Sequence, residues 1–137
     1  MPGYKVHIVA GMVTPVVFAF TANSIIDVGL VDITLIGGVL ASSIGSIAPD
    51  IDADYSKIRH MLPGLARAYD KLPKNAIFKH RGIACHSVVT VLALFTVWFR
   101  FPNWLTLGFM LGVASHHLLD GLTAAGLPNY FLTGGKR

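Results

Sequence analysis

The sequence predicts an all-α integral membrane protein, a bundle of four transmembrane helices with a cytoplasmic loop that carries a short interfacial helix. The first reason is composition: 53% of the 137 residues are hydrophobic, only 13% are charged and none is glutamate. The second reason is the presence of four long apolar stretches. The third is that nearly all basic residues lie near the two termini or in the loop between the second and third stretches. Together these features favour a small integral membrane protein over a soluble domain.

The four apolar stretches cover about residues 7 to 22, 28 to 48, 84 to 101 and 104 to 126. Each approaches the roughly 17 to 25 residues that a helix needs to cross the hydrocarbon core. A cleaved signal peptide is an alternative for the first stretch, but the segment "FTANS" lacks a small-x-small cleavage site. We therefore expect residues 1 to 137 to form a single membrane domain.

A polar loop of about residues 49 to 83 separates the second and third stretches. Apolar residues recur in it at helical spacing beside two basic residues: Leu62, Leu65, Tyr69 and Leu72, with Arg67 and Lys71. This pattern predicts a short helix that lies on the membrane surface.

Basic residues set the expected orientation. Four spans would place both termini and the long loop on one side, and that side holds ten of the eleven lysines and arginines, leaving only Arg100 on the other. The positive-inside rule then places both termini in the cytoplasm. The pI of about 9.5 reflects this basic side, which would face the anionic headgroups of the membrane, so membrane lipids are the expected partners. No nucleic-acid-binding motif is present. The single cysteine, Cys85, is expected to be a core residue.

Ionisable residues from separate segments should meet at the cytoplasmic end of this bundle. His116 and Asp120 fall within the fourth stretch, where ionisable groups are costly and therefore indicate function. The other candidates lie at the cytoplasmic ends of the first three stretches: His7, Asp50, Asp52, His80 and His86.

Helical spacing predicts that the fourth stretch turns its ligands inward. Gly108, Gly112, His116 and Asp120 recur every four residues, so the small residues that allow close helix packing share a face with the two ionisable groups. His117 is turned by about 100° from that face and is expected to be a packing residue.

Imidazole and carboxylate groups together suit zinc, manganese or iron, and the candidates are numerous enough for more than one ion. Two metals bridged by aspartates would support hydrolysis of a phosphoryl or carboxylic ester. Less specific interpretations remain open: Asp50 and Asp52 also fit a helix-terminal turn, and His60, Asp27 and Asp32 fit exposed surface positions.

Three segments resemble the signature blocks of a known family: "APDID" followed by "SKI", then "HRGIACHS", then "GVASHHLLDGLTAAGLP". They are similar to those of the YdjM-like proteins of the bacterial inner membrane, known as membrane-bound metal-dependent hydrolases and distantly similar to zinc-dependent phospholipase C. The resemblance implies a multinuclear zinc site and phosphoester substrates. It implies as ligands His7, Asp50, Asp52, His80, His86, His116 and Asp120, with Asp50, Asp52 and His86 in catalytic roles.

Two positions depart from the family pattern. One extra residue stands between His80 and His86, and Ala53 replaces the histidine that commonly follows the Asp-x-Asp pair.

Three functions are compatible with these features. The favoured one is a membrane-embedded, metal-dependent hydrolase of a phosphoester such as a lipid headgroup, with Arg81 and Lys57 holding the phosphate. A small metal or proton carrier is the second, although the polar residues gather at one face and no internal repeat is visible. The third is a structural or interaction protein whose helices are held together by a metal.

Overall fold

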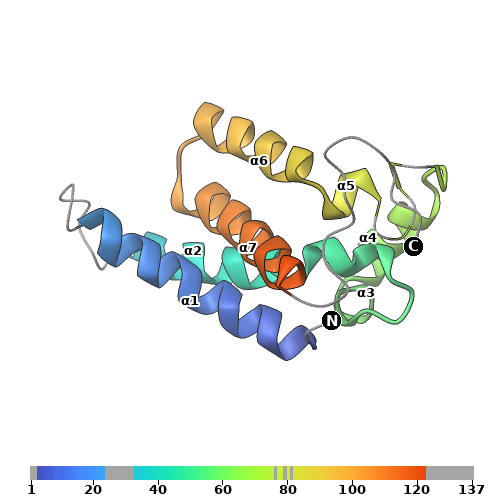
Figure 1. Cartoon of the computed structure of the whole chain (residues 1–137), viewed down its shortest axis with the longest axis horizontal. Coiled ribbons are helices and arrows are strands. Elements are labelled where there is room, and N and C mark those ends of the chain that lie inside the picture. The colour runs from blue at the N-terminus through green and yellow to red at the C-terminus, as the bar shows by residue number, and fades with distance from the viewer. Residues whose placement is uncertain (1–2, 24–32, 76, 79, 81, 123–137) are drawn as a thin grey trace.

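The computed structural model describes residues 3–23, 33–75, 77–78, 80 and 82–122. Every regular element in these ranges is a helix, so the predicted all-α class is confirmed (Figure 1). The predicted spans extend beyond these ranges at residues 28–32 and 123–126. Asp27 and Asp32, expected to be exposed, also lie outside the described residues.

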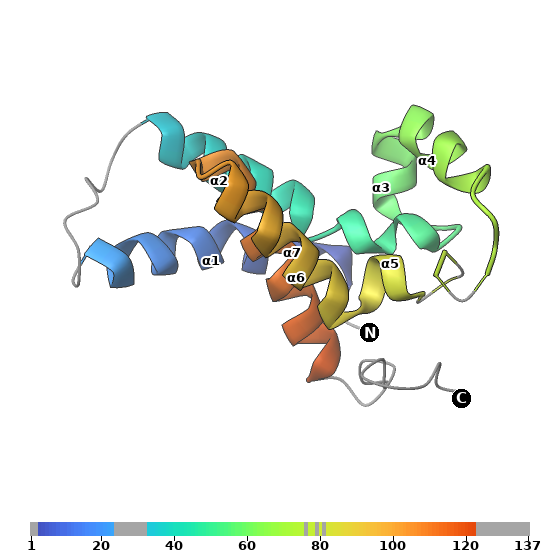
Figure 2. The same cartoon turned by 90° about the horizontal axis from the view of Figure 1, so that it is seen from above.

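Four longer helices form the body of the molecule: α1 (Tyr4–Asn23), α2 (Ile33–Gly45), α6 (Val88–Arg100) and α7 (Trp104–Gly121). Of these, α7 packs against the other three. Four short elements gather beyond the end at which α1 begins: η1 (Ala48–Asp52), α3 (Lys57–Met61), α4 (Pro63–Asp70) and α5 (Ile83–His86) (Figures 1 and 2).

Glycines bring α7 and α2 into main-chain contact. A side chain at Gly108 would collide with the carbonyl of Gly38, and one at Gly112 would collide with the carbonyl of Ser42. The predicted glycine face of the fourth apolar stretch therefore packs on α2, and the next residues of that face, His116 and Asp120, are carried into the interior.

The predicted third span, residues 84 to 101, is divided into α5 and α6. Ser87 between them is extended, with φ −130° and ψ 157°. The Ser87 hydroxyl donates to the Ile83 carbonyl at 2.6 Å, and the Thr90 hydroxyl lies 2.9 Å from the carbonyls of Ile83 and Ala84. These hydroxyls satisfy carbonyls that a continuous helix would have paired with main-chain N–H groups, which explains why the helix can break here.

Only α1, among the described helices, is long and apolar enough to cross a membrane, over Tyr4–Ala22 with a mean hydropathy of 1.6. Helix α6 is apolar but spans 13 residues. Large apolar side chains on both helices are exposed, including Val9, Phe20, Leu92 and Phe99, as a lipid-facing surface would require. The four-span arrangement remains a prediction.

The loop between α2 and α5 folds onto the end of the bundle through a small core. That core consists of Ile47, Ile51, Ile58, Tyr69 and Cys85. Residues 57–70 form two short helices, α3 and α4, where the sequence predicts one, and Pro63 begins the second. Cys85 is buried, as expected for a core residue.

Candidate metal centre

Five ionisable side chains from four elements meet in the interior of the molecule. His7 comes from α1, Asp50 from η1, His86 from α5, and His116 and Asp120 from α7. They form two groups of possible metal ligands, and His116 belongs to both. Within each group the ligand atoms lie within 4.8 Å of one another.

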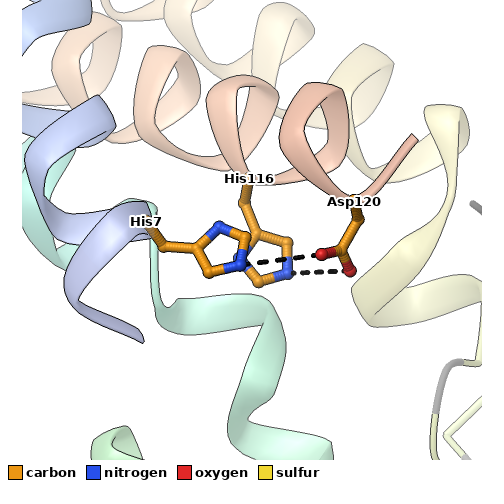
Figure 3. Close-up of side chains that lie close together, drawn as sticks. All are labelled: His7, His116 and Asp120. Carbon is orange, nitrogen blue, oxygen red and sulfur yellow. Dashed lines mark ion pairs between the residues drawn. The ribbon is translucent and has the colours of Figure 1, made fainter. Parts of the chain in front are cut away.

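The first group consists of His7, His116 and Asp120 (Figure 3). Nε2 of His7 lies 3.6 Å from Oδ1 of Asp120, and Nε2 of His116 lies 3.6 Å from Oδ2 of the same carboxylate. The two imidazole rings stack with their centroids 4.1 Å apart. All three residues are at most 2% exposed, so these polar groups are removed from bulk water.

The second group consists of Asp50, His86 and His116. Oδ1 of Asp50 lies 3.7 Å from Nε2 of His116 and 4.0 Å from Nε2 of His86. The two histidines are buried, whereas the Asp50 side chain is 24% exposed. Asp50 therefore connects the buried imidazoles to the surface.

A main-chain contact orients His116. Its Nδ1 lies 2.7 Å from the carbonyl oxygen of Ser46, which can only accept, so Nδ1 carries the proton and donates. The lone pair of the ring is consequently on Nε2, the atom that faces both aspartates. Nε2 is buried and makes no hydrogen bond, which is the state expected of a histidine prepared to bind a metal.

The geometry of both groups fits an ion of the size of zinc or manganese. Separations of 3.6 to 4.0 Å between nitrogen and oxygen are too long for hydrogen bonds. Ligands bonded at about 2.0 to 2.2 Å in a tetrahedral shell are roughly 3.4 Å apart, so small side-chain shifts would complete such a shell. These buried His and Asp groups could therefore hold a metal ion, and the mixed nitrogen and oxygen donors do not define which one.

Asp52 and His80 lie beside these groups rather than within them. One carboxylate oxygen of Asp52 is 3.2 Å from Nδ1 of His86, and the other is 3.2 Å from Nδ1 of His80. The side chain of His80 is 57% exposed. The resemblance implies that both residues are metal ligands; in the structure Asp52 lies next to Nδ1 of His86 and of His80, outside the two groups.

His117 lies outside both groups, in agreement with its helical phase. It is nevertheless buried, and its Nε2 lies 3.0 Å from the carbonyl oxygen of Cys85. This contact joins α7 to α5 next to His86, so His117 packs the helices that carry the candidate ligands.

A pocket of about 540 Å³ that opens to the surface is lined in part by Asp50. Its lining also includes Asp52, Lys57, His80 and Tyr4. Burial raises the pKa of the Asp50 carboxyl above its usual range, and its interactions with His86 and His7 partly oppose this shift. Lys57, expected to bind phosphate, is exposed in this lining, whereas Arg81, expected to share that role, lies outside the described residues.

Sequence reasoning missed two groups that shape the centre. The carbonyl of Ser46 fixes the tautomer of His116, and a main-chain acceptor leaves no signal in the identity of its residue. Arg59 donates to the main-chain carbonyl of Ile51 in η1, whereas the sequence placed it only among the ten basic residues of the expected cytoplasmic side.

The family model of the YdjM inner membrane protein matches residues 1–131. The chain belongs to the YdjM inner membrane protein family. This membership covers all five residues of the two groups and supports a location in the inner membrane. No curated protein and no solved structure matches the chain.

Membership in the YdjM family agrees with the resemblance of the three signature segments. The family description names the membrane but no reaction. The buried His and Asp groups, rather than the family description, indicate that this YdjM protein could hold a metal ion.

Proposed function

We propose that this YdjM protein is a membrane-embedded, metal-dependent hydrolase of a phosphoester, such as the headgroup of a membrane lipid. One observation carries the proposal: the unbonded Nε2 of buried His116 faces the carboxylates of both Asp50 and Asp120. A buried imidazole nitrogen without a hydrogen bond is unfavourable, and a divalent cation placed between Nε2 of His116 and these carboxylates would satisfy it.

The residues that would hold an ion form the two groups, one of His7, His116 and Asp120 and one of Asp50, His86 and His116. When bound, a zinc or manganese ion polarises a phosphoryl oxygen and makes water a better nucleophile. Asp52 lies 3.2 Å from Nδ1 of His86, where its carboxylate would orient that ring. Asp50 lines the pocket and is the candidate ligand best placed to meet a substrate, and the exposed Lys57 in the same lining would supply a positive charge for a phosphate.

The pocket favours a catalytic centre over a purely structural one. A structural metal site is closed by protein ligands, whereas a catalytic site keeps a position open to water and substrate. Asp50 is partly exposed and lines a pocket that reaches the surface, which supports access to the ion. The described candidate ligands gather at one end of the bundle, an arrangement that does not favour a carrier path across the membrane.

The proposal includes the four-span arrangement, with both termini and residues 49 to 83 in the cytoplasm. Its support is the distribution of lysine and arginine together with membership in the YdjM inner membrane family. Lipid of the inner leaflet would then meet the pocket from the side that carries Lys57.

Metal analysis and hydrolysis assays on the purified full chain test the proposal. Metal content is measured by mass spectrometry, and release of phosphate or phosphorylated headgroup is followed from vesicles of defined phospholipids. We expect bound zinc or manganese and an activity that a chelator removes and the metal restores. Protein without bound metal, after purification with zinc and manganese supplied, would contradict the metal centre; metal without hydrolysis of any phosphoester would contradict the enzyme.

A further inference from the structure

Arg59 on α3 joins two other elements of the loop. Its Nη1 donates to the carbonyl oxygen of Ile51 at 2.9 Å, and its Nη2 donates to Oδ2 of Asp70 at 2.5 Å. Although it is charged, the Arg59 side chain is only 15% exposed. One guanidinium group thus ties η1 to α4.

The carbonyl that Arg59 holds lies between the two aspartates of η1. Asp50 faces His86 and His116, and Asp52 faces His86, whereas Ile51 turns into the small core. Element η1 is a 3-10 helix of five residues without a side-chain cap at its start. Short 3-10 segments have poor hydrogen-bond geometry, so an external anchor has a large effect on where their side chains point.

We infer that Arg59 is a positioning residue of the metal centre, which holds η1 so that Asp50 and Asp52 stay aligned with the histidines. The inference rests on the proposed metal binding and adds a residue that lies outside both ligand groups. Arginine suits this role because its planar group offers several N–H donors in fixed directions, so it can bond a carbonyl and a carboxylate at once. A lysine ammonium has no such fixed fork.

Variants of Arg59 in the purified full chain test the inference. We compare Arg59→Ala and Arg59→Lys with Arg67→Ala, which removes the same charge from an exposed position on α4. Mn²⁺ affinity is measured by calorimetry, and the visible absorption of bound Co²⁺ reports ligand geometry. We expect Arg59→Ala to weaken Mn²⁺ binding by about tenfold or more and to change the Co²⁺ spectrum, as loss of a group that orients ligands does.

Arg59→Lys should show a smaller loss of affinity than Arg59→Ala, and Arg67→Ala should match the wild type. Equal affinity and equal Co²⁺ spectra in Arg59→Ala and Arg67→Ala would overturn the inference. If Arg59→Ala does not fold, Arg59→Lys is compared with Arg67→Ala instead. Equal Mn²⁺ affinity and equal Co²⁺ spectra in these two variants would overturn the positioning role. A wild-type chain that binds neither ion refutes the proposed function and this role together, whereas tight binding in all variants refutes the role of Arg59 alone.

Discussion

At the residue scale, His116 is the most constrained side chain of the centre. Ser46 fixes its protonated nitrogen, its side chain is completely buried, and its other nitrogen faces carboxylates from two elements. Because imidazole must offer a neutral lone pair to bind a metal, this arrangement prepares His116 as a ligand before any ion arrives.

Removal of ligands from the proposed centre should lower bound metal. We expect His116→Ala and Asp50→Ala to weaken zinc or manganese binding by at least about tenfold, the loss that even an outer partner of a ligand produces. His60→Ala, at an exposed position on α3, is the control and should keep the wild-type metal content. Equal metal content in all three variants, measured by mass spectrometry after gel filtration, would contradict the assigned ligands.

The sequence could predict His116 and Asp120 because both depend on local helical spacing, which a four-residue repeat reveals. It could not separate the roles of Asp50 and Asp52. The carboxylate of Asp50 faces Nε2 of His86, whereas that of Asp52 faces Nδ1 of the same ring. These directions follow from the turn between α2 and η1, which the residue types alone do not reveal.

At the scale of elements, the body of the fold depends on the close packing of α7 on α2. Its general form was predictable, because glycines at every fourth position indicate a helix that approaches a neighbour. The break at Ser87 was not predictable in the same way, since an apolar run looks continuous whether the carbonyls of Ile83 and Ala84 bond to main-chain N–H groups or to side-chain hydroxyls.

A methyl group at the contact between α7 and α2 should be costly. Gly112→Ala would press a Cβ atom against the Ser42 carbonyl, and we expect it to lower the free energy of unfolding by about 1 to 3 kcal/mol. Gly64→Ala on α4 is the matched control, because nothing lies within 4 Å of the added atom and alanine favours a helix. Thermal unfolding in detergent measures both, and a Gly112→Ala protein as stable as the control would contradict the packing.

The contact between α3 and α4 should weaken in acid. The hydrogen bond from Arg59 lowers the pKa of the Asp70 carboxyl below its ordinary value of 3.8. The contribution of the Arg59–Asp70 contact to stability is therefore present above pH 3.8 and is lost as the pH falls through the lowered pKa. Asp70→Asn removes this titration. We expect the wild type to be more stable than Asp70→Asn near neutral pH, with a difference that vanishes in strong acid; a difference independent of pH would contradict the assignment.

At the scale of the whole molecule, charge and burial divide the chain into two zones. Apolar side chains are exposed along α1 and α6, whereas polar and basic residues gather on the loop helices at the end of the bundle that holds the candidate centre. This division suits a protein of the inner membrane whose polar end meets the cytoplasm.

Reporter fusions test the orientation. We expect green fluorescent protein fused after Arg137 to fluoresce and alkaline phosphatase at the same position to be inactive, because ten of the eleven basic residues mark the cytoplasmic side. A phosphatase fusion inserted near Arg100 should show the opposite behaviour. An active phosphatase after Arg137 would refute the predicted topology.

The sharing of His116 between the two ligand groups also limits how ions can load. The Nε2 atom of His116 has a single lone pair, so it can bind only one ion at a time. An ion held by His7, His116 and Asp120 would leave an ion at Asp50 and His86 without its third ligand. The reverse is equally true. If both groups took up ions, their occupancy would therefore be anticooperative, because the second ion would have an incomplete set of protein ligands and would need water or a substrate oxygen in place of His116. A second, weaker ion of this kind would arrive together with the phosphate that completes its coordination.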